Sequence, residues 1–130
     1  ESEGTFEYVN YRRGANDLHA MVQQFRREKP VIIAIIGHSK GGNLVLLYAS
    51  KYNDIHTVVN ISGRFHLVKG IESRLGKDFF QRIKQDGCIE VKNGRGKFKY
   101  RVTEESLMDR LTTDTHAACL MIHQNCRSKV

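Results

Sequence analysis

The hydrophobic positions in the first half of the chain alternate between helical spacing and unbroken runs. Residues 16–29 carry apolar side chains along one face of a helix, and Pro30 ends this predicted helix. Residues 31–36 are all apolar, as is typical of a central parallel strand covered on both faces. Residues 41–52 are apolar around most of a helix, which should be the most buried one, and 57–62 form a second strand. This order predicts an α/β fold with a parallel sheet and right-handed crossovers.

The second half of the chain has a different pattern. Residues 71–83 are apolar on one helical face, with Gly76 as a break. Two short strands, 88–92 and 97–102, flank Asn-Gly-Arg-Gly at 93–96, which is a strong signal for a β-hairpin. This α-plus-hairpin segment does not continue the strand–helix alternation, so we interpret it as an inserted cap or lid.

Two further helices complete the predicted elements. Thr103 caps a helix that ends at Leu111, and a last helix runs from about residue 113 to 125. Residues 64–101 of the cap are expected to pack less densely than the core and to lie over the carboxyl ends of the strands. The predicted division is a partial α/β core at 1–63, a cap at 64–125 and the start of the next core strand at 126–130.

The basic residues are concentrated in one part of this cap. The whole chain has a formal net charge of +7, and residues 64–101 hold 11 of its 21 Lys and Arg but only 4 of its 14 Asp and Glu. The excess positive charge therefore lies entirely in this segment. It could be a solvated surface, which is the commoner case, a face that steers anionic substrates, or a nucleic-acid or membrane patch.

The cysteines and the lengths of the apolar runs bear on the cellular setting. Cys88, Cys119 and Cys126 cannot all pair within the chain and match no zinc-binding spacing, so we expect free thiols in a reducing compartment. The sequence holds no run of 18 apolar residues and no secretory leader, so we expect no membrane span. It opens on Glu1 rather than Met, as a processed or partial segment would. We expect a cytoplasmic location and leave import into an organelle open.

The candidate chemistry lies where the first predicted strand turns into a helix. Gly37-His38-Ser39-Lys40-Gly41 is a Gly-x-Ser-x-Gly motif in the strand–turn–helix context that a nucleophile elbow needs. Ser39 is the candidate nucleophile, on a strained backbone with φ above zero, and the Lys40 N–H would donate to an oxyanion. Gly37 and Gly41 are expected to prevent side chains from colliding. The alternative is a glycine-rich turn that only packs helix on strand. Neither a P-loop nor a Gly-x-Gly-x-x-Gly spacing is present.

A second group of residues has the spacing of one helical stripe. A tetrahedral zinc takes only two ligands from one helix as a rule, because four along a stripe span about 15 Å. No other segment has the spacing to complete such a site, so we expect these imidazoles and thiols to face the core and to bind no metal. The residues are His116, Cys119, His123 and Cys126.

The motif and its surroundings resemble a known family. Residues 36–43, Ile-Gly-His-Ser-Lys-Gly-Gly-Asn, and 60–65, Asn-Ile-Ser-Gly-Arg-Phe, are similar to plant α/β-hydrolase-fold proteins described as esterases or serine-aminopeptidase-like hydrolases. The resemblance covers essentially the whole chain as a central fragment of that family. It implies a sheet segment with a nucleophile elbow at Ser39 and a cap insertion. It also implies that the first oxyanion donor lies before Glu1 and that the triad acid and histidine lie at or beyond Val130.

The resemblance implies a serine hydrolase that cleaves ester, thioester or amide bonds of small molecules through an acyl-enzyme, without a metal or organic cofactor. Asp109 or Asp114 with His123 satisfies the order of a triad, but nothing in the spacing brings them to Ser39. We therefore expect the chain to be inactive alone. The alternative is a non-catalytic fragment or binding module with a basic face; too few aromatics accompany the charges to predict nucleic-acid stacking. His38 precedes the nucleophile on the elbow and is expected to point elsewhere, and His19, His56 and His66 are expected to be surface or packing residues.

Overall fold

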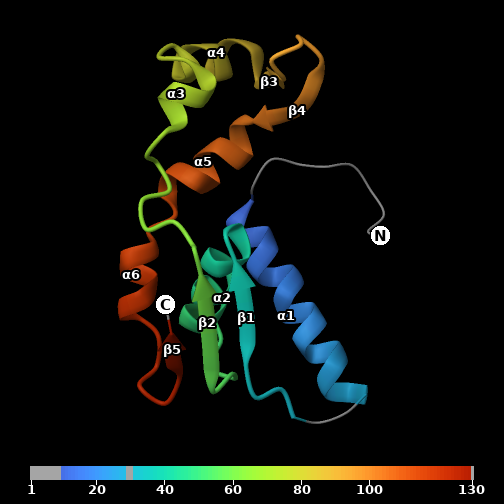
Figure 1. Ribbon diagram of the computed structural model, residues 1–130, viewed down its shortest axis with the longest axis vertical. Coiled ribbons are helices and arrows are strands. Elements are labelled where there is room, and N and C mark those ends of the chain that lie inside the picture. Colours follow the sequence, from blue (N-terminus) through green and yellow to red (C-terminus); the bar gives the residue numbers. More distant parts are fainter. Residues whose placement is uncertain (1–9, 29–30, 130) are drawn as a thin grey trace. The chain divides into compact units, whose positions relative to one another are not determined.

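The computed structural model describes residues 10–28 and 31–129, and these fall into two compact units (Figure 1). Of the described residues, the sheet unit comprises 11–28, 31–67 and 113–129, and the hairpin unit comprises residue 10 and residues 68–112. The hairpin unit is shorter than the predicted cap, 64–125, and the role of a cap stays a prediction. Each unit is described by itself, so the predicted position of the cap over the carboxyl ends of the strands stays a prediction.

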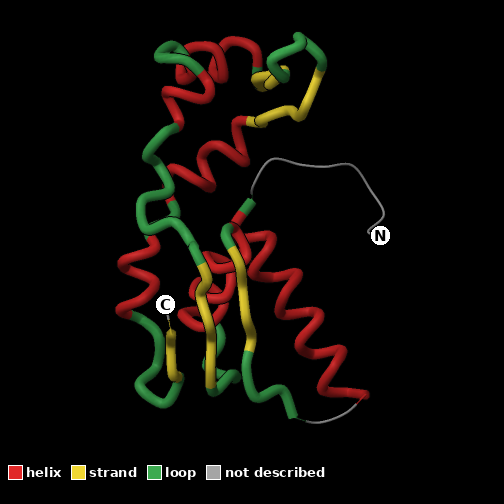
Figure 2. The backbone as a smooth tube through the Cα atoms, viewed as in Figure 1, coloured by secondary structure: helices red, strands yellow, loops and turns green. Residues whose placement is uncertain are grey.

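The sheet unit is built on three parallel strands, β1 (Ile35–His38), β2 (Thr57–Ile61) and β5 (Arg127–Lys129), in the order β1-β2-β5. Figure 2 shows the three side by side, with β2 in the middle. In register, Gly37 lies opposite Asn60 at the carboxyl ends of β1 and β2. This confirms the predicted neighbouring parallel strands. Three helices complete the unit: α1 (Tyr11–Glu28), α2 (Lys40–Lys51) and α6 (Thr115–Leu120).

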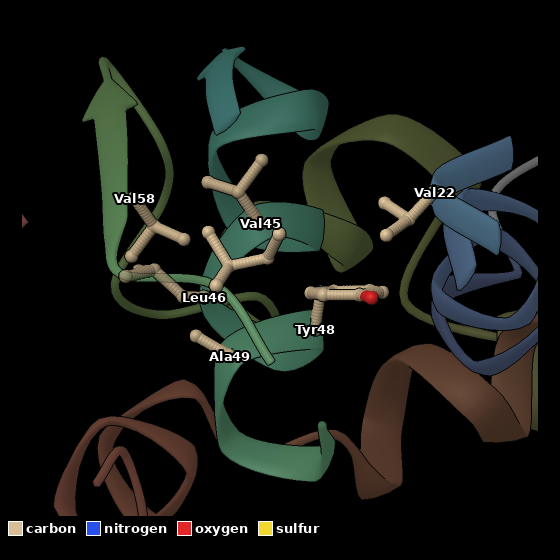
Figure 3. Packing of buried hydrophobic residues seen from close by; sticks show 7 residues of the cluster. Val22, Val45, Leu46, Tyr48, Ala49 and Val58 are labelled. Atoms are coloured by element: carbon tan, nitrogen blue, oxygen red, sulfur yellow. The ribbon is translucent and has the colours of Figure 1, made fainter. Parts of the chain in front are cut away.

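Helix α2 is the centre of the core, as its apolar circumference predicts. Half of its residues are buried, and it packs against β1, β2, α1 and α6. Figure 3 shows its side chains between Val58 of β2 and Val22 of α1. The Tyr48 ring is fully buried, and its hydroxyl donates to Oδ2 of Asp54 at 2.9 Å. Burial, followed by this hydrogen bond, raises the pKa of Tyr48 well above its usual range.

The other face of the sheet is largely exposed in the described residues, so the expectation of a strand buried on both faces is wrong. The strand itself is only Ile35–His38, because residues 31–34 pair with no neighbour. Ile36 and Ile61 are 66% and 47% exposed, on the side opposite Val58. The reason is that α2 alone packs broadly against both β1 and β2, while α1 and α6 pack against α2.

The hairpin unit follows the predicted pattern closely. The helices α3 (Ile71–Leu75) and α4 (Phe79–Asp86) are separated at Gly76, whose φ of 96° ends α3. Strands β3 (Cys88–Lys92) and β4 (Phe98–Thr103) pair antiparallel, and α5 (Glu104–Thr112) follows. The Thr103 hydroxyl accepts from the Ser106 N–H at 3.2 Å, which confirms the predicted cap. The core of this unit consists of Ile71, Leu75, Ile83, Ile89, Val102 and Leu107.

Two helix boundaries differ from those predicted. Helix α1 begins at Tyr11 rather than near residue 16, because Tyr11 and Ala15 extend its buried face by one turn. Helix α6 ends at Leu120 rather than near 125, because the chain turns there and leads into β5. Among the helices of the described part, none is long and apolar enough to cross a membrane.

Candidate active site

Ser39 lies at the sharp turn between the end of β1 and the start of α2. Its backbone has φ 55° and ψ −117°, which confirms the expected positive φ. Such a conformation costs a non-glycine residue about 1–3 kcal/mol, so the surrounding structure must hold it in place. Part of that hold is the Ser39 N–H, which donates to the carbonyl of Ile61 in β2 at 2.8 Å.

The Ser39 hydroxyl is not used to stabilise the helix. A serine at the residue before a helix normally accepts a hydrogen bond from one of the first N–H groups. Here Ser39 precedes α2 but makes no such side-chain bond, and the residue is exposed. Ser39 therefore lies exposed at the carboxyl ends of the strands, where ligands commonly bind in parallel sheets.

The turn requires glycine at two positions because backbone and side chains approach closely there. A Cβ on Gly37 would lie 2.0 Å from the carbonyl oxygen of Gly41. A Cβ on Gly42 would lie 2.1 Å from Oδ1 of Asn60. At Gly41 a Cβ would meet no atom within 4 Å, so the expected steric role of Gly41 is wrong. The close contact falls on the next residue because Gly42, not Gly41, faces β2.

Two buried asparagines, which the sequence reasoning missed, fix the chain that follows β2. Asn60 is 7% exposed, and its Oδ1 accepts from the Gly63 N–H at 2.9 Å. Asn43 is 1% exposed; its Oδ1 accepts from the Arg64 N–H at 2.9 Å, and its Nδ2 donates to the Arg64 carbonyl at 2.6 Å. Asparagines within an apolar helix and an apolar strand were the available signal, since buried amides need specific partners.

Between these bonds the backbone turns sharply a second time. Ser62, like Ser39, has φ 55°, and these are the two non-glycine residues with positive φ in the described part. Both turns lie at the carboxyl ends of adjacent parallel strands, and the Ser39–Ile61 hydrogen bond links them. The site is therefore a pair of neighbouring turns, of which only the first was expected from the sequence.

An aromatic cluster continues from the second turn. The Phe65 ring contacts His66 edge-on at 4.7 Å between centroids and the His116 ring of α6 at 5.7 Å. All three residues are exposed. His116 is thereby brought to the strand end at which Ser39 lies, whereas it was expected to face the core.

His123, which both candidate substitute triads need, does not lie at Ser39. His123 lines a small pocket together with residues 53–56, at the amino end of β2. Ser39 bonds to the carboxyl end of the same strand, about 13 Å further along at the usual rise of a strand. Asp114 accepts from the Ala117 N–H at 3.0 Å as the cap of α6, and Asp109 belongs to α5 of the hairpin unit.

The helical stripe of imidazoles and thiols does not exist in the structure. Because α6 ends at Leu120, His123 and Cys126 lie outside it, and Cys119 is exposed rather than buried. No group of three or more His, Cys, Asp or Glu in the described ranges could hold a metal ion. Cys88, Cys119 and Cys126 are all free thiols.

The remaining histidines lie at three separate places. His19 stacks on Tyr52 with 3.9 Å between ring centroids, which is a packing role. His38 is exposed at the end of β1, opposite Ile61. His56 lines the pocket at the amino end of β2.

The comparisons with known proteins give a family. The profile of the BAAT / acyl-CoA thioester hydrolase C-terminal family matches residues 18–124, which include Ser39, both asparagines and the hairpin unit. No curated protein and no solved structure matches the chain. The family is associated with thioester hydrolysis, so the match supports a hydrolase in general and a small-molecule acyl substrate. The chain therefore belongs to the BAAT / acyl-CoA thioester hydrolase C-terminal family.

Proposed function

We propose that the chain carries the nucleophile of a serine thioester hydrolase that acts on small acyl thioesters of the acyl-CoA type. The observation that carries this proposal is the Ser39 backbone, held at φ 55° between a parallel strand and a buried helix, with its hydroxyl not engaged in capping. A strained serine in this context is the geometry of a nucleophile elbow. The family supplies the substrate class, since its name specifies an acyl-CoA thioester.

The chemistry assigned to Ser39 is acyl transfer. Its Oγ attacks the thioester carbonyl carbon, the C–S bond breaks, the thiol leaves with a proton, and water hydrolyses the resulting acyl-enzyme. Lys40 is the first residue of α2, so its N–H belongs to the positive end of that helix, and we assign it to the developing oxyanion. This reaction uses no metal or organic cofactor.

Proton transfer limits what the 130 residues do alone. Among the described residues, no hydrogen bond brings a histidine or carboxylate to the Ser39 hydroxyl, and a serine without a positioned base is a poor nucleophile near neutral pH. Each missing oxyanion donor costs a further ~3 kcal/mol. Turnover by this chain alone should therefore be slow, and the resemblance implies that the base and its acid lie at or beyond Val130.

The test compares thioester hydrolysis by Ser39→Ala with that by Ser50→Ala, both in a version of the protein extended at both ends. Ser50 lies on the same helix, and its hydroxyl donates to the Leu47 carbonyl at 2.7 Å, so it is a matched serine away from the turn. Loss of acyl-CoA hydrolysis in the first variant alone supports the proposal. Equal turnover in both variants would remove Ser39 from the mechanism.

A second candidate function is binding of a polyanion by the hairpin unit. The turn of the β3–β4 hairpin exposes Lys92, Arg95 and Lys97, and Phe98 is exposed beside them. A face of this kind attracts anions of many sorts. Binding to arbitrary duplex DNA that weakens steeply as salt is raised would favour this function over a purely catalytic one.

A further inference from the structure

We propose that Phe65 is the residue of the Ser39 site that contacts the acyl chain, and that Asn43 is a positioning residue that holds Phe65 there. This inference rests on the proposed thioester hydrolase function, because it assigns the substrate's apolar part to a specific side chain. It concerns the Asn-Ile-Ser-Gly-Arg-Phe segment at 60–65, which has no role in the acyl transfer proposed above.

The first step of the argument is the position of the loop. The Ser39 N–H is bonded to the Ile61 carbonyl at 2.8 Å, so the chain leaves β2 beside the serine. The next residues are held by Asn60, which accepts from the Gly63 N–H, and by Asn43, which pairs with both polar groups of Arg64. Asn43 follows Ser39 by four residues in α2, about 6 Å along the helix axis. The loop is therefore fixed within about one helical turn of the nucleophile.

The second step is the nature of the hold. Asn43 and Asn60 are both buried, and a buried amide left without its partners carries a large desolvation cost. Asn43 offers a donor and an acceptor in one plane, and both are used by a single residue. An aliphatic side chain of similar size offers neither, so the loop would lose its attachment to α2.

The third step is what the loop presents. Phe65 follows the clamped Arg64 directly and is 57% exposed, so this large apolar ring contributes little to the core. Its ring packs edge-on with the rings of His66 and His116, and much of it stays open to solvent. An exposed ring at a fixed place beside a nucleophile gains by covering the hydrocarbon part of a substrate. In an acyl thioester, that part is the acyl chain.

The experiment measures binding of non-hydrolysable S-alkyl-CoA thioethers to the 130-residue chain by calorimetry, with ethyl and dodecyl chains. The wild type should bind the dodecyl compound more tightly than the ethyl one. Phe65→Ala should weaken dodecyl binding about tenfold and ethyl binding less than about twofold. Phe65→Leu should retain most of the difference. Phe80→Ala, which removes a 47% exposed ring from the hairpin unit, is the matched control and should change neither.

Three outcomes would overturn the inference: no preference for the longer chain in the wild type, an equal loss of both ligands in Phe65→Ala, or no loss of either. The result is independent of turnover, because thioethers are not cleaved. If Ser39→Ala leaves hydrolysis unchanged in the extended protein, the proposed function fails. The length dependence of thioether binding then still decides the role of Phe65.

The positioning role of Asn43 has its own arm. Asn43→Leu should reduce the dodecyl preference as Phe65→Ala does, and adding Phe65→Ala should cause no further loss, because both changes remove the same contact. Additive losses would overturn the role of Asn43. If Asn43→Leu does not fold, as judged by circular dichroism, Asn43→Asp decides. It keeps the acceptor for the Arg64 N–H and should show a partial loss of preference, whereas an unchanged preference contradicts the positioning role.

Discussion

The side chain of Asn43 pairs with both backbone polar groups of Arg64, which lies 21 positions further along the chain. The Arg64 N–H donates to Oδ1 at 2.9 Å, and Nδ2 donates to the Arg64 carbonyl at 2.6 Å. This bracket joins the helix that follows Ser39 to the loop that follows β2. It holds together the two turns at the carboxyl ends of β1 and β2, so a substitution at either turn should alter the conformation of the other.

The first prediction concerns the stability of this bracket. Asn43→Leu leaves the Arg64 N–H and carbonyl without their buried partner, so we expect the free energy of unfolding to fall by about 2–4 kcal/mol. Asn16→Ala removes an exposed asparagine of α1 whose side chain accepts a hydrogen bond from Lys51. This control should change the free energy of unfolding by less than about 0.5 kcal/mol. Urea denaturation followed by circular dichroism measures both. Similar stability of the two variants would mean that the bracket contributes little.

Alanine substitution of two adjacent glycines, Gly42 and Gly41, should change the free energy of unfolding differently. Gly42→Ala places a Cβ 2.1 Å from Asn60 Oδ1, so the asparagine must move and its bond to the Gly63 N–H is strained. We expect a loss of about 1–3 kcal/mol in unfolding free energy. Gly41→Ala meets open space and should be neutral or stabilise the helix by up to about 1 kcal/mol. Thermal unfolding of both variants checks the order, and a reversed order would contradict the observed contact.

The strain at Ser39 predicts a trade between stability and activity. Ser39→Gly removes the energetic cost that φ 55° imposes on a residue with a side chain. Glycine also raises the conformational entropy of the unfolded chain, which cancels part of this stabilisation. We expect Ser39→Gly to be more stable than Ser39→Ala by about 1 kcal/mol. Both should lack thioester hydrolysis in the extended protein. Equal stability of the two variants would show that the turn is relaxed rather than strained.

Tyr48 makes stability depend on pH at the alkaline end. Burial, then the hydrogen bond to Asp54, raises its pKa above the unfolded value of about 10, so the folded chain retains a proton that the unfolded chain releases. The stabilisation is fully present below pH ~10 and declines as pH rises above it, by up to about 1.4 kcal/mol per pH unit. Urea unfolding from pH 8 to 11 should show this decline.

The matched variants for this pH dependence are Tyr48→Phe and Tyr52→Phe. Tyr48→Phe should remove the part of the decline that Tyr48 causes, although it lowers stability at neutral pH by leaving Asp54 Oδ2 with Arg26 alone, at 3.2 Å. Tyr52 lies at the end of α2, where its hydroxyl donates to Asn16 at the exposed surface. Tyr52→Phe should keep the decline. If the slope is the same in wild type and Tyr48→Phe, another group is responsible for it.

The sequence alone determined those elements that depend on a few consecutive residues. Six unbroken apolar residues followed by Gly-x-Ser-x-Gly predicted a strand, a strained turn at Ser39 and a buried helix, and all three are observed. The hairpin turn at 93–96, the break at Gly76 and the Thr103 cap also depend on a few consecutive residues. Backbone sterics and short-range hydrogen bonds are sufficient to specify these features.

The remaining features depend on which surfaces meet in three dimensions. The exposure of Ile36 and Ile61 follows from the packing of α2 on one face of the sheet, which an apolar run cannot reveal. The pairing of Asn43 with Arg64, and the steric need for glycine at 42 rather than 41, join residues that are distant in sequence. The pattern of apolar positions predicts which residues are buried. It does not predict the partners of buried polar groups, because the register of β1 and β2 sets those partners. That register brings the two turns together and makes a site of them.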